Sequence, residues 1–178
     1  DGANEMGNNL PVVSLGTGKT AKLISAGFDH TCAVLNDDTV KCWGRGRYGR
    51  LGYGDDNNNR GDDPNEMGNN LPVVDLGTGK TAKQIDVSKE HTCALLSDNT
   101  VKCWGRGNEG RTGYGNTIDR GDGPNEMGDN LPTVNLGTGK TAKQIVSGED
   151  HTCAILNDDS VKCWGYGANG RLGYGDNN

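Results

Sequence analysis

Short runs of apolar residues alternate with turn-forming residues along the whole chain. In the first third, three such runs cover residues 20–24, 30–35 and 39–44, and Gly, Asn or Asp bounds each of them. They are too short for helices and rich in β-forming residues, so each predicts a β-strand. A fourth, weaker run covers residues 10–13. The pattern therefore predicts an all-β chain.

The second and third runs predict a β-hairpin whose turn is residues 36–38. If these three residues form the loop, Leu35 faces Thr39, and Cys32 lies directly opposite Cys42 in an antiparallel ladder. Opposed residues have Cα atoms roughly 4.5–5.5 Å apart, which lies within the range of about 4.4–6.8 Å found for disulfides. The hairpin therefore predicts a disulfide between Cys32 and Cys42.

The whole pattern occurs three times. The motif Asn-Glu-Met-Gly begins at Asn4, Asn65 and Asn125, so that the steps are 61 and 60 residues, and His-Thr-Cys-Ala and Lys-Cys-Trp-Gly recur with the same steps. A fixed period of this kind indicates a repeat architecture, and short strands with a Gly/aromatic motif in each unit are typical of propeller blades. We predict three tandem propeller-type blades of short antiparallel strands, in an incomplete ring or an open array. The repeats span residues 1–64, 65–124 and 125–178.

Composition adds that the core is thin. Only 31% of the 178 residues are hydrophobic, 30 are glycine, and six are cysteine. Disulfides reinforce small cores, and the hairpin geometry extends to all three repeats. A zinc site is the alternative, but each pair is ten residues apart and the pairs are about sixty apart, whereas zinc gathers four ligands in one place. The predicted disulfides are Cys32–Cys42, Cys93–Cys103 and Cys153–Cys163.

Charge and hydropathy exclude several partners. The net charge is −6, and the arginines near position 47 are surrounded by acidic loops, so no basic stripe is available for nucleic acid. No apolar run is long enough to span a bilayer. Three local disulfides favour an oxidising compartment, so we expect an extracellular or secreted protein. The chain begins at Asp1 and not at Met, which fits either processing or a window on a longer chain.

Two motifs resemble ligand sites and are interpreted as turns. Residues 16–20 end in the Gly-Lys-Thr of a phosphate loop, but the full signature needs a glycine where Val13 stands, and the other repeats have Val74 and Val134 there. The acidic loop of the first repeat carries weak candidate calcium ligands, but it lacks the residue order of an EF-hand and is interpreted as a solvated loop. The candidate calcium ligands are Asp55, Asn57, Asn59 and Asp62. We therefore expect no cofactor.

One histidine and one tryptophan recur in each repeat. No carboxylate or nucleophile recurs beside the histidines in a way that suggests a catalytic site, so we predict that the chain is not an enzyme. We interpret the histidines as structural residues that bond to backbone near a blade junction, and the tryptophans as structural too. These residues are His30, His91 and His151, and Trp43, Trp104 and Trp164.

The linked motifs resemble a known family. The segments 24–34, 40–44 and 49–54 read Ile-Ser-Ala-Gly-Phe-Asp-His-Thr-Cys-Ala-Val, Val-Lys-Cys-Trp-Gly and Gly-Arg-Leu-Gly-Tyr-Gly, and this order resembles the regulator of chromosome condensation repeat. The resemblance implies four-stranded blades, usually seven in a ring. Its best-known member is a guanine-nucleotide exchange factor on chromatin, but many relatives are scaffolds or binding modules. Copy two departs from the pattern at Ser88 and Thr112, so we expect the middle blade to be the loosest.

The ends of the array favour self-association. Repeat arrays need polar terminal units, but repeats one and three carry the same apolar positions as repeat two. Joining Asn178 to Asp1 nearly rebuilds a loop between repeats, three or four residues short. We therefore predict a non-catalytic structural protein that joins copies head to tail in a filament or ring. The alternative is a module that presents its blade loops to a protein or glycan. The residues expected at the free ends are Leu23, Val34, Trp43, Ile145, Ile155 and Trp164.

Overall fold

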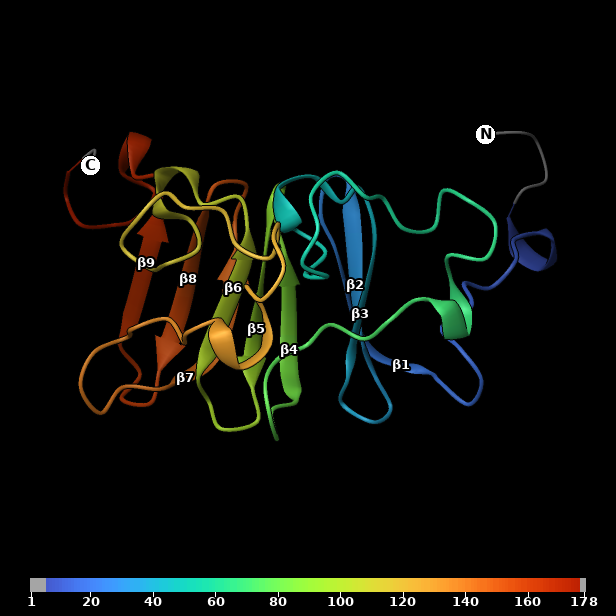
Figure 1. The fold of residues 1–178 in the computed structure, drawn as a ribbon. Helices are drawn as coiled ribbons and strands as arrows, with labels where there is room; N and C mark the ends of the chain where they lie inside the picture. Colours follow the sequence, from blue (N-terminus) through green and yellow to red (C-terminus); the bar gives the residue numbers. More distant parts are fainter. Residues whose placement is uncertain (1–5, 177–178) are drawn as a thin grey trace.

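The computed structural model describes residues 6–176 and consists of three antiparallel sheets placed side by side (Figure 1). Each sheet has three strands in sequence order, which confirms the predicted all-β, three-blade fold. The first sheet contains β1 (Ala21–Ala26), β2 (His30–Leu35) and β3 (Val40–Gly44). The second contains β4 (Ala82–Val87), β5 (His91–Leu96) and β6 (Val101–Gly105), and the third contains β7 (Ala142–Ser147), β8 (His151–Leu156) and β9 (Val161–Gly165).

The hairpin of each sheet has the register predicted from its three-residue turn. In the first sheet, the Leu35 amide donates to the Thr39 carbonyl (2.8 Å), and Cys32 lies opposite Cys42. The structure joins each opposed pair in a disulfide, with Cα–Cα distances of 4.1, 4.1 and 4.0 Å, slightly shorter than expected. The three disulfides are Cys32–Cys42, Cys93–Cys103 and Cys153–Cys163.

An extended segment pairs with the outer edge of each of the first two sheets, in the place of a fourth strand. The amide of Val74 donates to the carbonyl of Val40 on β3 (2.8 Å), and the amide of Val134 donates to the carbonyl of Val101 on β6 (2.7 Å). Each segment leads into the following sheet but pairs with the preceding one. This pairing does not test the repeat boundaries at 64/65 and 124/125, which remain a prediction. The extended segment after each boundary pairs with the sheet before it, so neighbouring repeats share a sheet.

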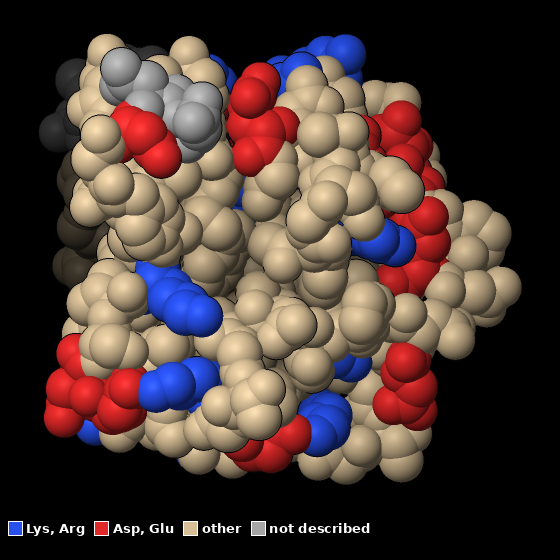
Figure 2. Space-filling model, turned by 90° about the vertical axis from the view of Figure 1, so that its left-hand side faces the viewer, with Lys and Arg blue, Asp and Glu red and all other residues tan. Residues whose placement is uncertain are grey.

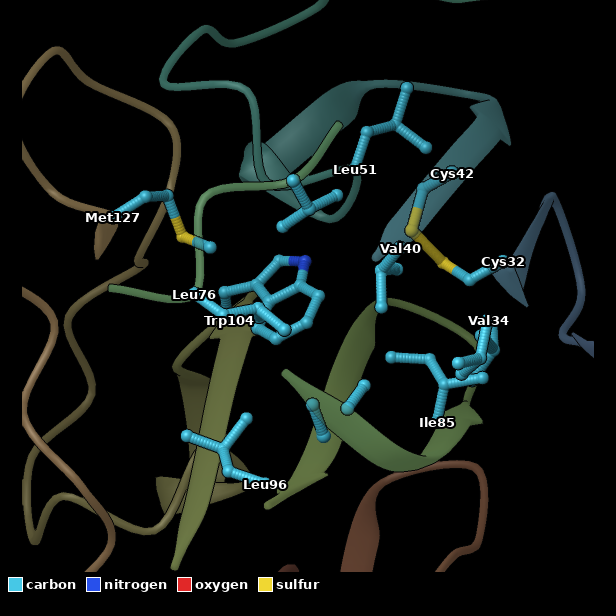
Figure 3. Packing of buried hydrophobic residues seen from close by; sticks show 14 of the residues in the cluster. Cys32, Val34, Val40, Cys42, Leu51, Leu76, Ile85, Leu96, Trp104 and Met127 are labelled. Carbon is cyan, nitrogen blue, oxygen red and sulfur yellow. A yellow bond between two sulfur atoms is a disulfide. The ribbon is translucent and has the colours of Figure 1, made fainter. Parts of the chain in front are cut away.

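The hydrophobic core lies mainly between the blades. Trp104 of β6 is fully buried and packs among Leu51, Leu76 and Met127, close to the Cys32–Cys42 disulfide (Figure 3). A second cluster occupies the corresponding position between the second and third sheets. Because side chains of both neighbours form each cluster, a blade receives much of its core from the blade beside it.

The prediction that the middle blade is the loosest is wrong. Ser88 is buried, its φ is not positive, and its hydroxyl lies 2.6 Å from Nδ1 of His91. At the equivalent Gly27, an added Cβ would lie 2.0 Å from the Ser88 carbonyl oxygen, so glycine is needed there for close packing. Thr112 is also fully buried. The middle blade has a neighbour on both sides, and it is therefore the most enclosed of the three.

Candidate functional site at the ends of the array

The histidines lie at junctions, which we define as the contacts between consecutive blades. Nε2 of His30 lies 2.7 Å from the Thr92 hydroxyl of the next blade, and Nε2 of His91 lies 2.8 Å from the Thr152 hydroxyl. Burial lowers the pKa of both rings to about 3, so both are neutral at physiological pH. The ring partners across the junctions are side-chain hydroxyls and not the backbone groups that we expected.

One pair resembles a nucleophile and its base. The Ser88 hydroxyl contacts the His91 ring, as an activated serine would. Both residues are buried, His91 completely, and the Ser88 hydroxyl also contacts the His91 carbonyl at 2.8 Å. A substrate therefore has no access to this serine, and the pair stabilises the junction.

The four candidate calcium ligands do not converge on one point. Asp55 forms an ion pair with Arg60 at 2.6 Å, and the Asn59 amide donates to Asp62 at 2.8 Å. Asn57 donates to the neighbouring Asp56. Within residues 6–176, no group of three or more His, Cys, Asp or Glu side chains is placed to hold a metal ion. The same residues contain no helix long and apolar enough to cross a membrane.

The glycine turns that resemble phosphate loops form hydrogen bonds with the following repeat. The Thr17 amide donates to the Asn69 side chain at 2.8 Å, and the Thr78 amide donates to the Asp129 side chain at 2.8 Å. Asn69 and Asp129 belong to the short 3-10 turns η3 (Gly68–Asn70) and η5 (Gly128–Asn130). A backbone amide that would face a phosphate is thus bonded to protein.

Each junction also contains a tryptophan and a lysine bridge. The Trp104 indole N–H donates to the Arg50 carbonyl of the preceding blade, and the Trp164 indole donates to the Arg111 carbonyl, both at 3.1 Å. The Lys102 ammonium donates to the carbonyls of Leu76 (2.9 Å) and Gly128 (2.7 Å). It therefore joins the extended segments of two successive repeats. Lys41 makes the same pair of bonds to Leu15 and Gly68.

A row of alternating charges runs across both junctions. The Arg50 guanidinium lies 3.5 Å from Asp29 of its own blade and 3.7 Å from Glu90 of the next. Arg111 lies 3.3 Å from Glu90 and 2.7 Å from Asp150. Burial alone would raise the pKa of Glu90, but the hydrogen bond from Arg106 and the surrounding arginine charges lower it overall. Sequence reasoning missed this row, although the arginine of Gly-Arg-[Leu/Thr]-Gly-Tyr-Gly recurs in every repeat and offered a signal.

Each end of the array carries the residues that one side of an internal junction contributes. At the first end, Ile24 is 66% exposed, whereas the equivalent Ile85 and Ile145 are 5% and 1% exposed. At the last end, Val161 is 58% exposed, whereas Val40 and Val101 are fully buried. The repeated residues are the same, so the cause of the exposure is that no blade within residues 6–176 covers these two ends.

The expected list of end residues was partly wrong. Ile155 is exposed as predicted, and Trp43 and Trp164 are half-buried. Leu23 is exposed too, but it lies opposite Val34 on the face of the first sheet that turns toward the second blade, not at the free end. Val34 and Ile145 are buried, because β4 packs on the first sheet and β7 packs on the second. Ile145 therefore points toward the second blade, whereas Val146, Ile155 and Val161 lie on the opposite face of the third sheet and are exposed.

Comparison with known proteins identifies the repeat. A family model of the regulator of chromosome condensation (RCC1) repeat matches residues 21–50, 82–111 and 142–171, so each match covers one sheet and the loop that follows it. A second model of the same repeat matches residues 37–95 and 98–155.

The chain resembles several curated proteins over most of its length. It is 36% identical to the ultraviolet-B receptor UVR8 of Arabidopsis thaliana over 155 residues, which cover 86% of this chain and 31% of UVR8. It is 30% identical to protein pim1 of Schizosaccharomyces pombe over 158 residues, which cover 86% of this chain and 29% of pim1. The chain thus spans about a third of the length of these relatives.

Solved structures show the same fold. Prp20p from Saccharomyces cerevisiae matches 88% of this chain and 35% of its own, with a TM-score of 0.65 and 19% identity. Human WBSCR16 matches 95% of this chain and 40% of its own, with a TM-score of 0.65 and 18% identity. At these identities the likeness concerns the arrangement of the blades alone.

Proposed function

Because the chain belongs to the regulator of chromosome condensation (RCC1) repeat family, we propose that it works through contacts between blades and not through catalysis. Its ends join those of other copies, head to tail, as an extracellular structural protein. The observation that carries this proposal is the exposure, at the two ends, of positions that are buried at both internal junctions.

Apolar burial supplies the driving force for this association. Ile24 and Val13 at one end, and Val161 and Ile155 at the other, are all more than one third exposed. Soluble monomers rarely expose contiguous apolar patches of more than a few hundred Å². At about 25 cal/mol per Å², covering such a patch contributes several kcal/mol before the entropy of association is subtracted.

The two ends differ, so the contact is heterologous. Repetition of a heterologous contact gives a ring if the rotation closes and a filament if it does not. Two copies that close would form a ring of six blades, and an unclosed series would form a filament.

The disulfides support the assignment to an oxidising compartment. All six cysteines are paired in the structure, and such pairs persist mainly in secreted and extracellular proteins. Intact-mass measurement of the native protein, with and without reductant, tests this assignment. A six-hydrogen mass increase on reduction is expected, and free thiols in the native protein would contradict both the pairing and the compartment.

Analytical ultracentrifugation of the 178-residue chain tests self-association. We expect the sedimentation coefficient to rise with protein concentration in the micromolar range. A salt series sharpens the result: the charge row continues at the ends through Asp29 and Arg171, so association should weaken as salt screens these charges. A single monomeric species at every concentration would overturn self-association.

A module that binds another protein is the second candidate. The Tyr48 ring has the guanidinium groups of Arg47 and Arg106 over it, 4.5 and 4.8 Å from its centroid. This loop surface suits an acidic protein or glycan. Prp20p, which shares the fold, is described as binding Gsp1p and histones. A stable monomer would favour this candidate, and the loop variant Arg47→Glu would then weaken capture of the partner.

A further inference from the structure

The extended segment before each sheet is an edge strand for the sheet before it. Leu71, Val74 and Leu76 of the second repeat are all at most 4% exposed beside β3. The Val74 amide bonds to the Val40 carbonyl, and the Gly68 carbonyl accepts a bond of 2.7 Å from Lys41. The third repeat supplies the same contacts to β6. The molecule thus contains this arrangement twice.

The first such segment, residues 10–15, pairs with no sheet of the described part of the chain. Leu10 and Val13 are 53% and 56% exposed, although their equivalents Leu71 and Val74 are buried. Its sequence, Leu-Pro-Val-Val-Ser-Leu at residues 10–15, matches the Leu-Pro-Val-Val-Asp-Leu of residues 71–76 at every buried position. The segment is therefore chemically equipped to act as an edge strand.

Strand β9 has the opposite deficiency. It repeats the Val-Lys-Cys-Trp-Gly sequence of β6, but no described segment pairs with its outer edge. The Lys162 ammonium donates to the Leu136 carbonyl at 2.9 Å, and no described residue takes the place of Gly68 or Gly128. Figure 2 shows this end of the molecule: its centre is mostly uncharged, and acidic residues lie mainly near its borders.

We propose that residues 7–15 of one copy add to β9 of a second copy as its fourth strand. The Val13 amide donates to the Val161 carbonyl of the neighbouring copy, and the Gly7 carbonyl accepts from Lys162. The occupant is a second copy because the segment and the edge reproduce a pairing that the chain already makes twice. This inference rests on the proposed self-association and specifies how it occurs.

Other junction contacts follow from the same docking. His151 would meet the Thr31 hydroxyl of the second copy, as His30 and His91 meet Thr92 and Thr152. The Trp43 indole would donate to the Arg171 carbonyl, as Trp104 and Trp164 donate to Arg50 and Arg111. The strand therefore brings the blade faces into the register of the internal junctions.

Two substitutions in one segment separate strand addition from other modes of association. Val13 is equivalent to the buried Val74, whereas its neighbour Val12 is equivalent to Val73, which is 46% exposed beside β3. Val13→Asp would place an unpaired carboxylate in the junction and should weaken association about 100-fold. Val12→Asp is the matched control, and it should associate like the unchanged chain. Both residues are exposed in the single chain, so both variants should unfold at the same temperature as the parent.

Hydrogen exchange of the full chain gives the second readout. Peptides that contain residues 7–15 should exchange quickly at low concentration and slowly at high concentration. Association with equal Kd values for the two variants, or without protection of this segment, would overturn strand addition and leave self-association intact. A monomer at all concentrations would overturn both.

Discussion

Strands β6 and β9 have the same sequence, Val-Lys-Cys-Trp-Gly, in different surroundings. Every residue of β6 is buried, whereas Val161 and Lys162 of β9 are exposed and the last three residues of β9 are half-buried. β6 has the extended segment of residues 131–136 on its outer edge, and the third blade packs against one face of its sheet. β9 has neither among the described residues.

The difference teaches that burial in this protein comes from the next repeat. A blade forms its own hydrogen-bonded sheet and its own disulfide, but the following repeat covers its outer edge. Among the described residues, the outer edge of the middle blade is therefore covered and that of the third blade is not, although nearly identical sequences form them. The variants below test this contrast, from the largest expected effect to the smallest.

Tryptophan truncation should separate the two blades most strongly. Trp104→Ala removes a fully buried side chain and its indole bond to Arg50, so it should cost about 3–5 kcal/mol of unfolding free energy. Trp164→Ala should cost clearly less, because Trp164 is only half-buried. Urea unfolding of both variants at low protein concentration measures the difference, with Trp104→Phe as a milder variant that still folds. Equal losses would contradict the contrast.

Disulfide removal should affect the two blades equally. Replacing Cys93 and Cys103 together by alanine, or Cys153 and Cys163 together, opens loops of the same length, with a sequence separation of 10. The unfolding free energy of each double variant should fall by about 2–4 kcal/mol, because a disulfide acts largely by restricting the unfolded chain. A much larger loss in the middle blade, measured by the same urea unfolding, would show that packing around the disulfide decides its contribution.

Replacing one buried threonine of the middle blade should stabilise the chain. Thr112 is fully buried and its hydroxyl has no hydrogen-bond partner among the described residues. Thr112→Val keeps the shape of the side chain and removes the unpaired hydroxyl, so the free energy of unfolding should rise by about 1 kcal/mol. Thr117→Val, at an exposed position, is the control and should change little. A loss of stability in Thr112→Val would indicate that the hydroxyl is bonded.

The same loop position should respond oppositely to pH in two repeats. Burial, followed by the hydrogen bond and charge of Glu126, raises the pKa of Asp122 to about 6. The stability that this protonated carboxyl supports is complete below pH 4 and is lost as the pH rises through 6. Asp122→Asn should therefore lose less stability between pH 4 and pH 7 than the parent. In the first repeat the equivalent Asp62 has a lowered pKa because Asn59 donates to it, so Asp62→Asn should not flatten this loss.

Local features of the sequence predicted the blades well. The three-residue turn at 36–38 placed Cys32 opposite Cys42, because an antiparallel register follows from turn length alone. The period of about sixty residues identified the blade count. Both inferences depend on residues close together in the chain.

Contacts between repeats were not predictable in the same way. Lys41 bonds to Gly68 and Arg50 pairs with Glu90, which are 27 and 40 residues apart in sequence and come together only when the blades pack. The period states that repeats exist, but it does not state which sheet receives each extended segment. For this reason Ile145 was expected on a free face, while the structure buries it against the second blade.

The indole N–H groups test the central claim most directly, because each blade has one tryptophan. Trp104 and Trp164 already donate to carbonyls of the preceding blade, whereas Trp43 has no such blade before it among the described residues. Nuclear magnetic resonance can follow hydrogen exchange of the three groups as the protein is concentrated. The account predicts that exchange at Trp43 slows on assembly to the level of the other two. Exchange at Trp43 that stays fast in an associated sample would contradict the claim that the ends complete each other as an internal junction does.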